Sequence, residues 1–203
     1  MTRSKISQEV KMDVLKEIGN IGMGNATSAL SQLLNYERID MEVPYISLCL
    51  LEDIPEIIGG ADEEIVGVFT VSPSSFYMIF MLRIESASQL VSYLTRQDIS
   101  IEEEMGRSVL LEVGNIITAS YLNSLSYMTG LTFLPTPPSL AVDMAGAILG
   151  TVLAEASVAE DHIMLLKTAL TTTSGKINGH LLIIPDSDSL DIVVKLLIDG
   201  ASK

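Results

Sequence analysis

Cysteine, histidine and tryptophan are scarce in this 203-residue sequence, which has one cysteine, two histidines and no tryptophan. A single cysteine excludes an internal disulfide and leaves a metal site without a second thiol. Cys49 lies in an apolar run with no histidine near it, so we expect a buried, unreactive thiol. His162 and His180 fall on predicted strands and are interpreted as packing or surface residues. The sequence therefore predicts no metal site.

Basic residues are also few, with 12 Lys and Arg against 26 Asp and Glu and a formal net charge of −14. Binding to nucleic acid requires clustered Lys and Arg that neutralise phosphates. This charge balance argues against a nucleic-acid partner, and we expect the partners to be proteins.

Long hydrophobic runs are absent although 48% of the residues are hydrophobic and the mean hydropathy is +0.41. No apolar run reaches the roughly 18 residues that a membrane span needs. Residues 1–5 are followed by polar residues and not by the apolar segment of a secretory signal. We therefore expect a cytoplasmic protein without membrane insertion, of a length that suits one large domain or two fused half-domains.

What the chain does have is a repeat. Residues 13–20 return as residues 108–115, and the differences 112 − 17 and 115 − 20 are both 95. The register pairs Glu17 with Glu112 and Asn20 with Asn115. We predict one domain over 1–203 that is made of two repeats, at about 7–97 and 101–200.

Each predicted repeat opens with a long helix, at about 7–34 and 101–128, with apolar residues at helical spacing along one face. Projection at about 100° per residue puts polar and small residues on the opposite face. These are Asp13, Glu17, Asn20, Gly24 and Ser31 in the first helix, and Ser108, Glu112, Asn115, Ala119 and Ser126 in the second. Gly19 and Gly114 fall near the inward edge, where a glycine lets another element approach despite its low helix propensity.

The other segments follow the same order in both halves. We predict a strand at 38–50 with Pro44 at an edge or a bulge, a short helix or loop at 51–60, strands at 65–71 and 76–84, and a helix at 86–96. The second half then has a strand at 131–134, a helix at 140–157, strands at 162–172 and 180–184, and a helix at 187–198. This order predicts an α+β fold, an internally duplicated pseudo-two-fold sandwich with two long motif helices and a largely antiparallel sheet shared by both halves.

Glu and Asn three positions apart on an exposed helix face are common, and alone they indicate a solvated surface. The repeat favours a functional face, because Glu, Gly and Asn keep the same phase while the residues around them change. Small outward residues leave a flat strip for a partner. Ile21 and Ile116 flank each Asn, as a docking contact would require.

These residues resemble the motif of the CheC, CheX and FliY phosphatases of bacterial and archaeal chemotaxis, and the CheC type most. That motif is Asp or Ser, then Glu, Asn and a later Pro. It is matched by Asp13, Glu17, Asn20 and Pro44, and again by Ser108, Glu112, Asn115 and Pro138. The first copy has 23 residues between Asn and Pro and the second has 22. Two motif copies are typical of CheC.

The resemblance implies hydrolysis of the phosphoaspartate of the response regulator CheY. An acyl phosphate is already activated, so positioning a water and stabilising charge suffice. Asn20 and Asn115 would orient the water through their amides, and Glu17 and Glu112 would hold the regulator's active-site lysine. Asp13 and Ser108 would support the two sites. Mg²⁺ would be bound by the regulator, and this chain would bind no cofactor.

The resemblance also implies binding of the receptor deamidase CheD. Residues 139–149 include small residues that permit close helix contact, and we expect Asp143 at the helix start to contribute to the interface. The alternative for this segment is a buried core helix. The rival function is a non-catalytic adaptor that sequesters CheD or senses phosphorylated CheY, and a third is a phosphatase for a different receiver domain. Because the symmetry is internal, we expect a monomer.

Overall fold

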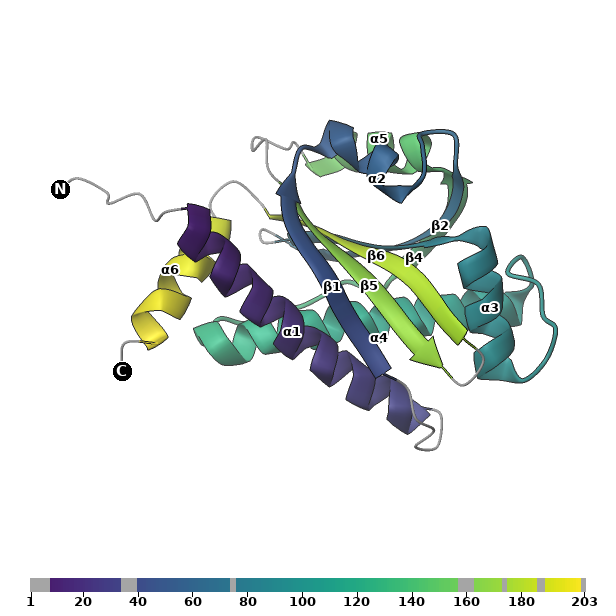
Figure 1. Cartoon of the computed structure of the whole chain (residues 1–203), viewed down its shortest axis with the longest axis horizontal. Helices are drawn as coiled ribbons and strands as arrows, with labels where there is room; N and C mark the ends of the chain where they lie inside the picture. Colours follow the sequence, from purple (N-terminus) through teal and green to yellow (C-terminus); the bar gives the residue numbers. More distant parts are fainter. Residues whose placement is uncertain are drawn as a thin grey trace.

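Apolar strands build one six-stranded sheet at the centre of the molecule (Figure 1). The structure is a computed structural model that describes residues 8–33, 40–73, 76–156, 163–172, 175–185 and 189–201. The strands are β1 (Asp40–Cys49), β2 (Glu64–Ser72), β3 (Phe76–Arg83), β4 (Ser139–Met144), β5 (Ile163–Thr172) and β6 (Gly175–Pro185). Their order is β1-β5-β6-β3-β2-β4, and every neighbouring pair is antiparallel. Most residues of β3 and β5 are buried on both faces, which explains their nearly continuous apolar sequence.

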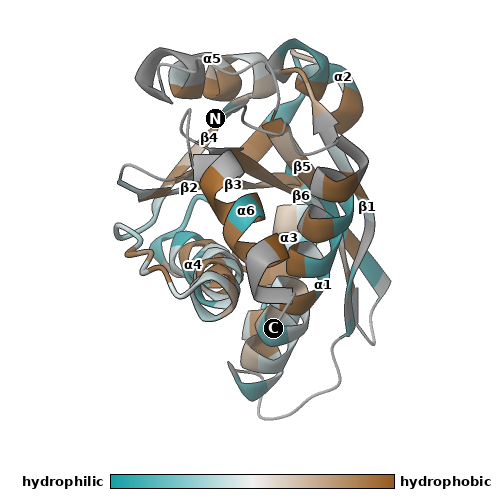
Figure 2. Cartoon of the chain, turned by 90° about the vertical axis from the view of Figure 1, so that its left-hand side faces the viewer, coloured by the Kyte–Doolittle hydropathy of each residue, from teal (hydrophilic) through white to brown (hydrophobic). Residues whose placement is uncertain are grey.

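Helices cover both faces of this sheet (Figure 1). The face with the two long helices carries α1 (Gln8–Leu33), α3 (Ile84–Thr95), α4 (Glu104–Thr129) and α6 (Ser189–Ala201). The other face carries α2 (Ile54–Ile58), which follows the short 3-10 helix η1 (Leu51–Asp53), and α5 (Ala145–Ala156). Alternate strand residues feed two separate apolar cores, one on each face of the sheet, and Figure 2 shows hydrophobic residues concentrated on the central strands. The predicted α+β fold is confirmed.

The order helix, strand, helix, strand, strand, helix occurs in both halves of the chain. In the sheet, β3 and β6 are central neighbours, β2 and β5 flank them, and β4 and β1 form the edges. Each edge strand pairs with a strand from the other half, β1 with β5 and β4 with β2. The halves therefore interlock in one sheet, as expected, while the repeat bounds of about 7–97 and 101–200 stay a prediction.

The first predicted strand is confirmed together with its irregularity. β1 is an edge strand, and its register with β5 shifts between Glu42 and Tyr45, the interval that contains Pro44. Proline has no N–H for a sheet hydrogen bond, so an edge or a bulge is where a strand tolerates it.

The strand predicted at 131–134 is wrong. These residues form the loop after α4, in which Phe133 is buried and packs against Phe76 with 5.4 Å between the ring centroids. The Thr136 amide donates to the Val71 carbonyl oxygen over 2.8 Å, which fixes the loop to the end of β2. Anchoring one aromatic residue in the core produced an apolar alternation that imitates a strand.

The helix predicted at 140–157 begins too early. Residues 139–144 form β4, which pairs with Glu64–Phe69 of β2, and α5 begins only at Ala145. Asp143 is therefore a strand residue and not the start of a helix. Pairing with β2 decides the conformation of residues 139–144, since strand formation depends on tertiary context.

The other predicted elements are present with shifted ends. The largest shift is in β6, which begins at Gly175 and not at residue 180. His162 and the side chain of Pro44 lie outside the described residues.

Glycines let the two long helices lie directly on the sheet. A Cβ built on Gly19 would lie 2.6 Å from Ile46 Cδ1 of β1, and one built on Gly114 would lie 2.5 Å from Val68 Cγ1 of β2. Real Cβ atoms essentially never come this close. The close approach predicted for both glycines is confirmed.

Replacing Gly114 with Ala is expected to destabilise the fold by about 1–3 kcal/mol, the usual cost of overpacking a core. Val68 is β-branched and rigid, so it cannot move aside by rotating a distant atom. The matched control is Gly24→Ala, because Gly24 is exposed in α1 with nothing within 4 Å of an added Cβ. That change is expected to stabilise the protein by about 0.5–1 kcal/mol through helix propensity. Urea unfolding measures both, and a Gly114→Ala variant as stable as the parent would contradict this packing.

Candidate functional site

The burial pattern of the two motif helices turns the same residue types outward. In α1, Glu17 and Asn20 are exposed while the two residues between them, Ile18 and Gly19, are buried. In α4, Glu112 is exposed and Asn115 is half-buried, and the two residues between them are again buried. At 3.6 residues per turn, positions i and i+3 share a face, so the buried pair fixes the outward direction of Glu and Asn.

The two residues predicted to support the sites lie on the same faces. Asp13 and Ser108 are exposed one turn before each Glu. The small residues that follow differ in exposure, since Gly24 is exposed while Ala119 is half-buried. Ile21 and Ile116 are both half-buried. These isoleucines therefore offer less apolar surface to a partner than the sequence suggested.

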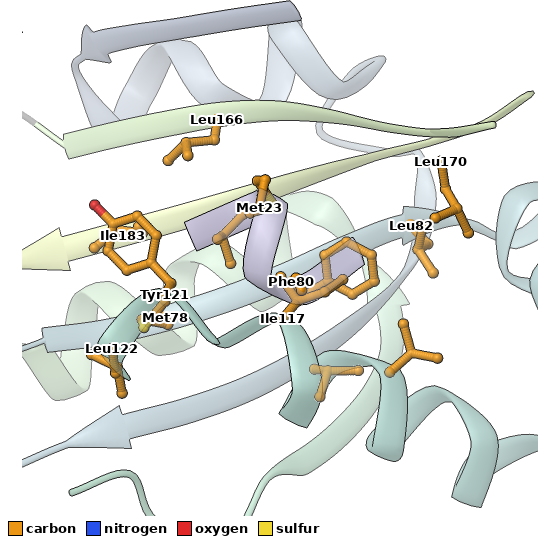
Figure 3. Packing of buried hydrophobic residues seen from close by; sticks show 14 of the residues in the cluster. Met23, Met78, Phe80, Leu82, Ile117, Tyr121, Leu122, Leu166, Leu170 and Ile183 are labelled. Atoms are coloured by element: carbon orange, nitrogen blue, oxygen red, sulfur yellow. The ribbon is translucent and has the colours of Figure 1, made fainter. Parts of the chain in front are cut away.

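Helices α1 and α4 pack against each other over the sheet. A Cβ on Gly22 would lie 3.2 Å from the Tyr121 Cα atom, so the backbones approach closely at this point. Tyr121 belongs to the buried main core that Figure 3 shows from close by, and its hydroxyl lies 3.8 Å from Met164 Sδ of β5. Burial raises the pKa of its phenol. The contact places both Glu and Asn faces in one layer of the molecule.

A hydrogen bond also joins the two helices. The Asn25 amide Nδ2 donates to Ser124 Oγ over 3.0 Å, and Ser124 Oγ donates to the Ser120 carbonyl oxygen over 2.8 Å. This link was not predicted, because 99 positions separate Asn25 and Ser124 and neither belongs to the motif.

The four Glu and Asn side chains of the two motifs have polar atoms available for a partner. Within the described ranges, no side-chain hydrogen bond or ion pair engages Glu17, Asn20, Glu112 or Asn115. An amide can donate one hydrogen bond and accept another, whereas a carboxylate only accepts. In each pair the Asn amide can therefore orient a water molecule, and the Glu carboxylate can accept a hydrogen bond from a cationic donor.

Asp143 lies apart from both motif faces, on the edge strand β4. Its Oδ1 accepts a hydrogen bond from the Met144 amide over 2.7 Å, and its side chain is exposed. It also lines a cavity of about 280 Å³ together with Ala147 and Thr151 of α5. The residue is thus placed to contact a partner at the β4–α5 side of the molecule.

Cys49 and His180 show the chemistry expected of packing residues. Cys49 is half-buried, whereas the sequence predicted a buried thiol. Burial raises the pKa of this thiol. His180 lies on β6 beside Lys167 of β5. Burial, and then the charges of Lys167 and Arg83, lower the pKa of His180 to about 4.

The described residues offer neither a metal cluster nor a membrane span. Across these residues, no group of three or more His, Cys, Asp or Glu side chains is placed to hold a metal ion. Among the helices of the same residues, none combines the length and apolar character that a bilayer crossing requires.

Comparison with known proteins agrees with the motif. A sequence model of the CheC-like family matches residues 10–48 and 105–142, and each segment contains one complete motif. The CheY-P phosphatase CheC of Bacillus subtilis (strain 168) is 34% identical over 193 residues, covering 91% of this chain and 92% of that protein. The chain belongs to the CheC-like family. The resemblance drawn from the two motifs is thus confirmed.

Solved structures share the fold of this CheC-like chain. FliY of Thermotoga maritima superposes with a TM-score of 0.75 at 18% identity, covering 97% of this chain and 99% of that one. FliM from the FliG–FliM complex of H. pylori gives a TM-score of 0.67 at 10% identity, covering 94% and 100%. At these identities the likeness concerns the fold alone.

The lowered pKa of His180 predicts a pH-dependent stability. Between pH 6.5 and about 4 the unfolded chain binds a proton at this residue that the folded chain does not bind. The free energy of unfolding therefore falls as the pH falls through this window, by about 2 kcal/mol between pH 7 and pH 5 for this group. Urea unfolding of the parent and of His180→Gln at both pH values measures the difference. Equal pH dependence of the two proteins would contradict the assignment.

Proposed function

We propose that this CheC-like chain hydrolyses the phosphoaspartate of a phosphorylated CheY-type response regulator. The observation that carries the proposal is the twin arrangement of exposed Glu and Asn around a buried pair, once on α1 and once on α4. The activity named for the B. subtilis relative supports it. Two such faces give one molecule two candidate active sites.

The proposed mechanism assigns different roles to Asn and Glu. Asn20 and Asn115 each orient the attacking water, accepting from it through the amide oxygen or donating to it through the amide nitrogen. Glu17 and Glu112 accept a charge-assisted hydrogen bond from the regulator's active-site lysine. Positioning of this kind is sufficient because an acyl phosphate is an activated bond.

The flat strip beside the motif supports the docking step. Gly24 is exposed, and a Cβ added there meets nothing within 4 Å, so the surface beside Asn20 is open to a partner. Asp13 and Ser108 support the sites from the preceding turn. Mg²⁺ belongs to the regulator in this proposal, and this chain contributes only side chains.

Replacing Asn20 and Asn115 together with Ala is expected to lower the rate of regulator dephosphorylation by about 10²-fold, the usual effect of losing one preorganised polar group from a transition state. Each single substitution leaves one site and is expected to lose only that site's share. The measurement is multiple-turnover decay of phosphorylated CheY, with Asn123→Ala on the exposed surface of α4 as the control. An unchanged rate in the double variant would refute the mechanism. Binding without turnover in the parent would instead establish the adaptor.

We also propose that Asp143 contributes to a CheD interface. Its exposed carboxylate and the adjoining cavity beside α5 support this. Asp143→Arg is expected to weaken CheD binding by tenfold or more, because a contact with a cation would become a repulsion. Titration calorimetry measures the affinity, with Asp98→Arg in the loop after α3 as a charge-matched control. If Asp143→Arg binds CheD as tightly as the parent does, Asp143 has no place in the interface.

A further inference from the structure

A groove adjoins the second motif between α3 and α4. The end of α3, the loop after it and the first turns of α4 enclose about 430 Å³. Its walls include the apolar residues Leu94, Ile99, Met105 and Val109, and also the motif residues Ser108 and Glu112. We call this feature the α3–α4 groove.

We propose that the α3–α4 groove binds an apolar side chain of the phosphorylated regulator while Glu112 contacts the regulator's lysine and Asn115 acts at its phosphoaspartate. This inference rests on the function proposed above and adds a specificity contact to one of its two sites. Because Ser108 and Glu112 line the groove and belong to the motif, a regulator that contacts Glu112 also covers the groove opening.

The groove has an apolar floor and one exposed apolar residue at its rim. Met105 is 58% exposed, whereas Leu94, Ile99 and Val109 are half-buried and pack against the main core. A methionine is unbranched and adapts its shape to an apolar partner. The rigid floor and the adaptable rim together suit the insertion of one side chain.

The negative charge around the rim indicates that the inserted side chain is accompanied by a positively charged group. Glu102, Glu103 and Glu104 are exposed directly before Met105, and Glu112 is exposed on the next turns. The nearby Arg107 donates from Nη2 to the Leu140 carbonyl oxygen of β4 over 3.3 Å, away from the groove. The residues that line the groove include no cation. An apolar residue next to a positive group complements this surface, and the lysine assigned to Glu112 supplies such a group.

Helix capping explains only part of this rim. Glu103 Oε1 accepts from the Ser100 amide over 3.0 Å, and acidic residues are favoured at a helix N-terminus in any case. Neither effect explains an exposed methionine in the first turn. Met105 is the most exposed apolar residue of the groove lining, so it is the position at which the proposal is tested.

The first motif offers a matched control. With the register of 95, Val10 of α1 corresponds to Met105 of α4, and Val10 is 40% exposed. A lysine at either position adds the same charge at the same helical phase, in front of Glu17 in one case and of Glu112 in the other.

The experiment is steady-state dephosphorylation of CheY in an Asn20→Ala background, so that the second motif carries the turnover. Adding Met105→Lys is expected to raise KM by about tenfold with kcat within twofold, as for the loss of one buried apolar contact. Met105→Leu is expected to retain the KM of the background, and Val10→Lys to leave it within twofold. Met105→Ser removes the apolar contact without adding a charge that would repel the regulator's lysine, and it is expected to raise KM in the same direction as Met105→Lys. An unchanged KM in Met105→Ser would assign the effect of Met105→Lys to charge and overturn the groove.

Two further results would overturn the groove assignment: an unchanged KM in Met105→Lys, whether or not kcat falls, or an equal rise of KM in Val10→Lys. Adding Asn115→Ala to the same background tests the proposed function separately. If turnover survives Asn115→Ala, the catalytic role of the second motif is wrong, independently of the Met105 results. If Asn115→Ala abolishes turnover and Met105→Lys leaves KM unchanged, the catalytic role stands and only the groove assignment is wrong.

Discussion

Each motif helix touches the sheet through a glycine, and the presentation of the polar faces depends on this contact. Gly19 lies against Ile46 of β1, and Gly114 lies against Val68 of β2. The glycine and the residue before it occupy the buried side of the helix, so the Glu and the Asn that flank them must point away. A larger residue at Gly114, which faces the rigid Val68 side chain, would lift or rotate α4 and change where the Asn115 amide lies.

The interlocked sheet gives these two helices a common support. Because β1 pairs with β5 and β4 with β2, each half of the chain completes the sheet of the other. The close approach of Gly22 to Tyr121 then holds α1 beside α4. The protein thus presents two polar faces from one layer, and the α3–α4 groove gives the face on α4 an additional apolar contact.

The sequence predicted the phase of the motif helices because a period of 3.6 extends over 26 residues in each. It did not locate β4, since residues 139–144 become a strand only by pairing with β2, about 75 positions away in the chain. The strand predicted at 131–134 is a loop for a related reason. Phe133 packs against Phe76, which is distant in the sequence, and the sequence pattern does not reveal this contact. The Asn25–Ser124 hydrogen bond and the groove around Met105 were not predicted, because both require the packing of separate elements.

Asn and Glu of the same helix face are proposed to act directly on the phosphorylated site of the regulator. A crystal structure of this chain with CheY, held in its activated form by beryllofluoride and Mg²⁺, tests this most directly. We expect the amide of Asn20 or Asn115 within hydrogen-bond distance of the fluoride group, and Glu17 or Glu112 on the regulator's lysine. A complex in which CheY binds elsewhere, with both motif faces open to solvent, would contradict the proposed mechanism.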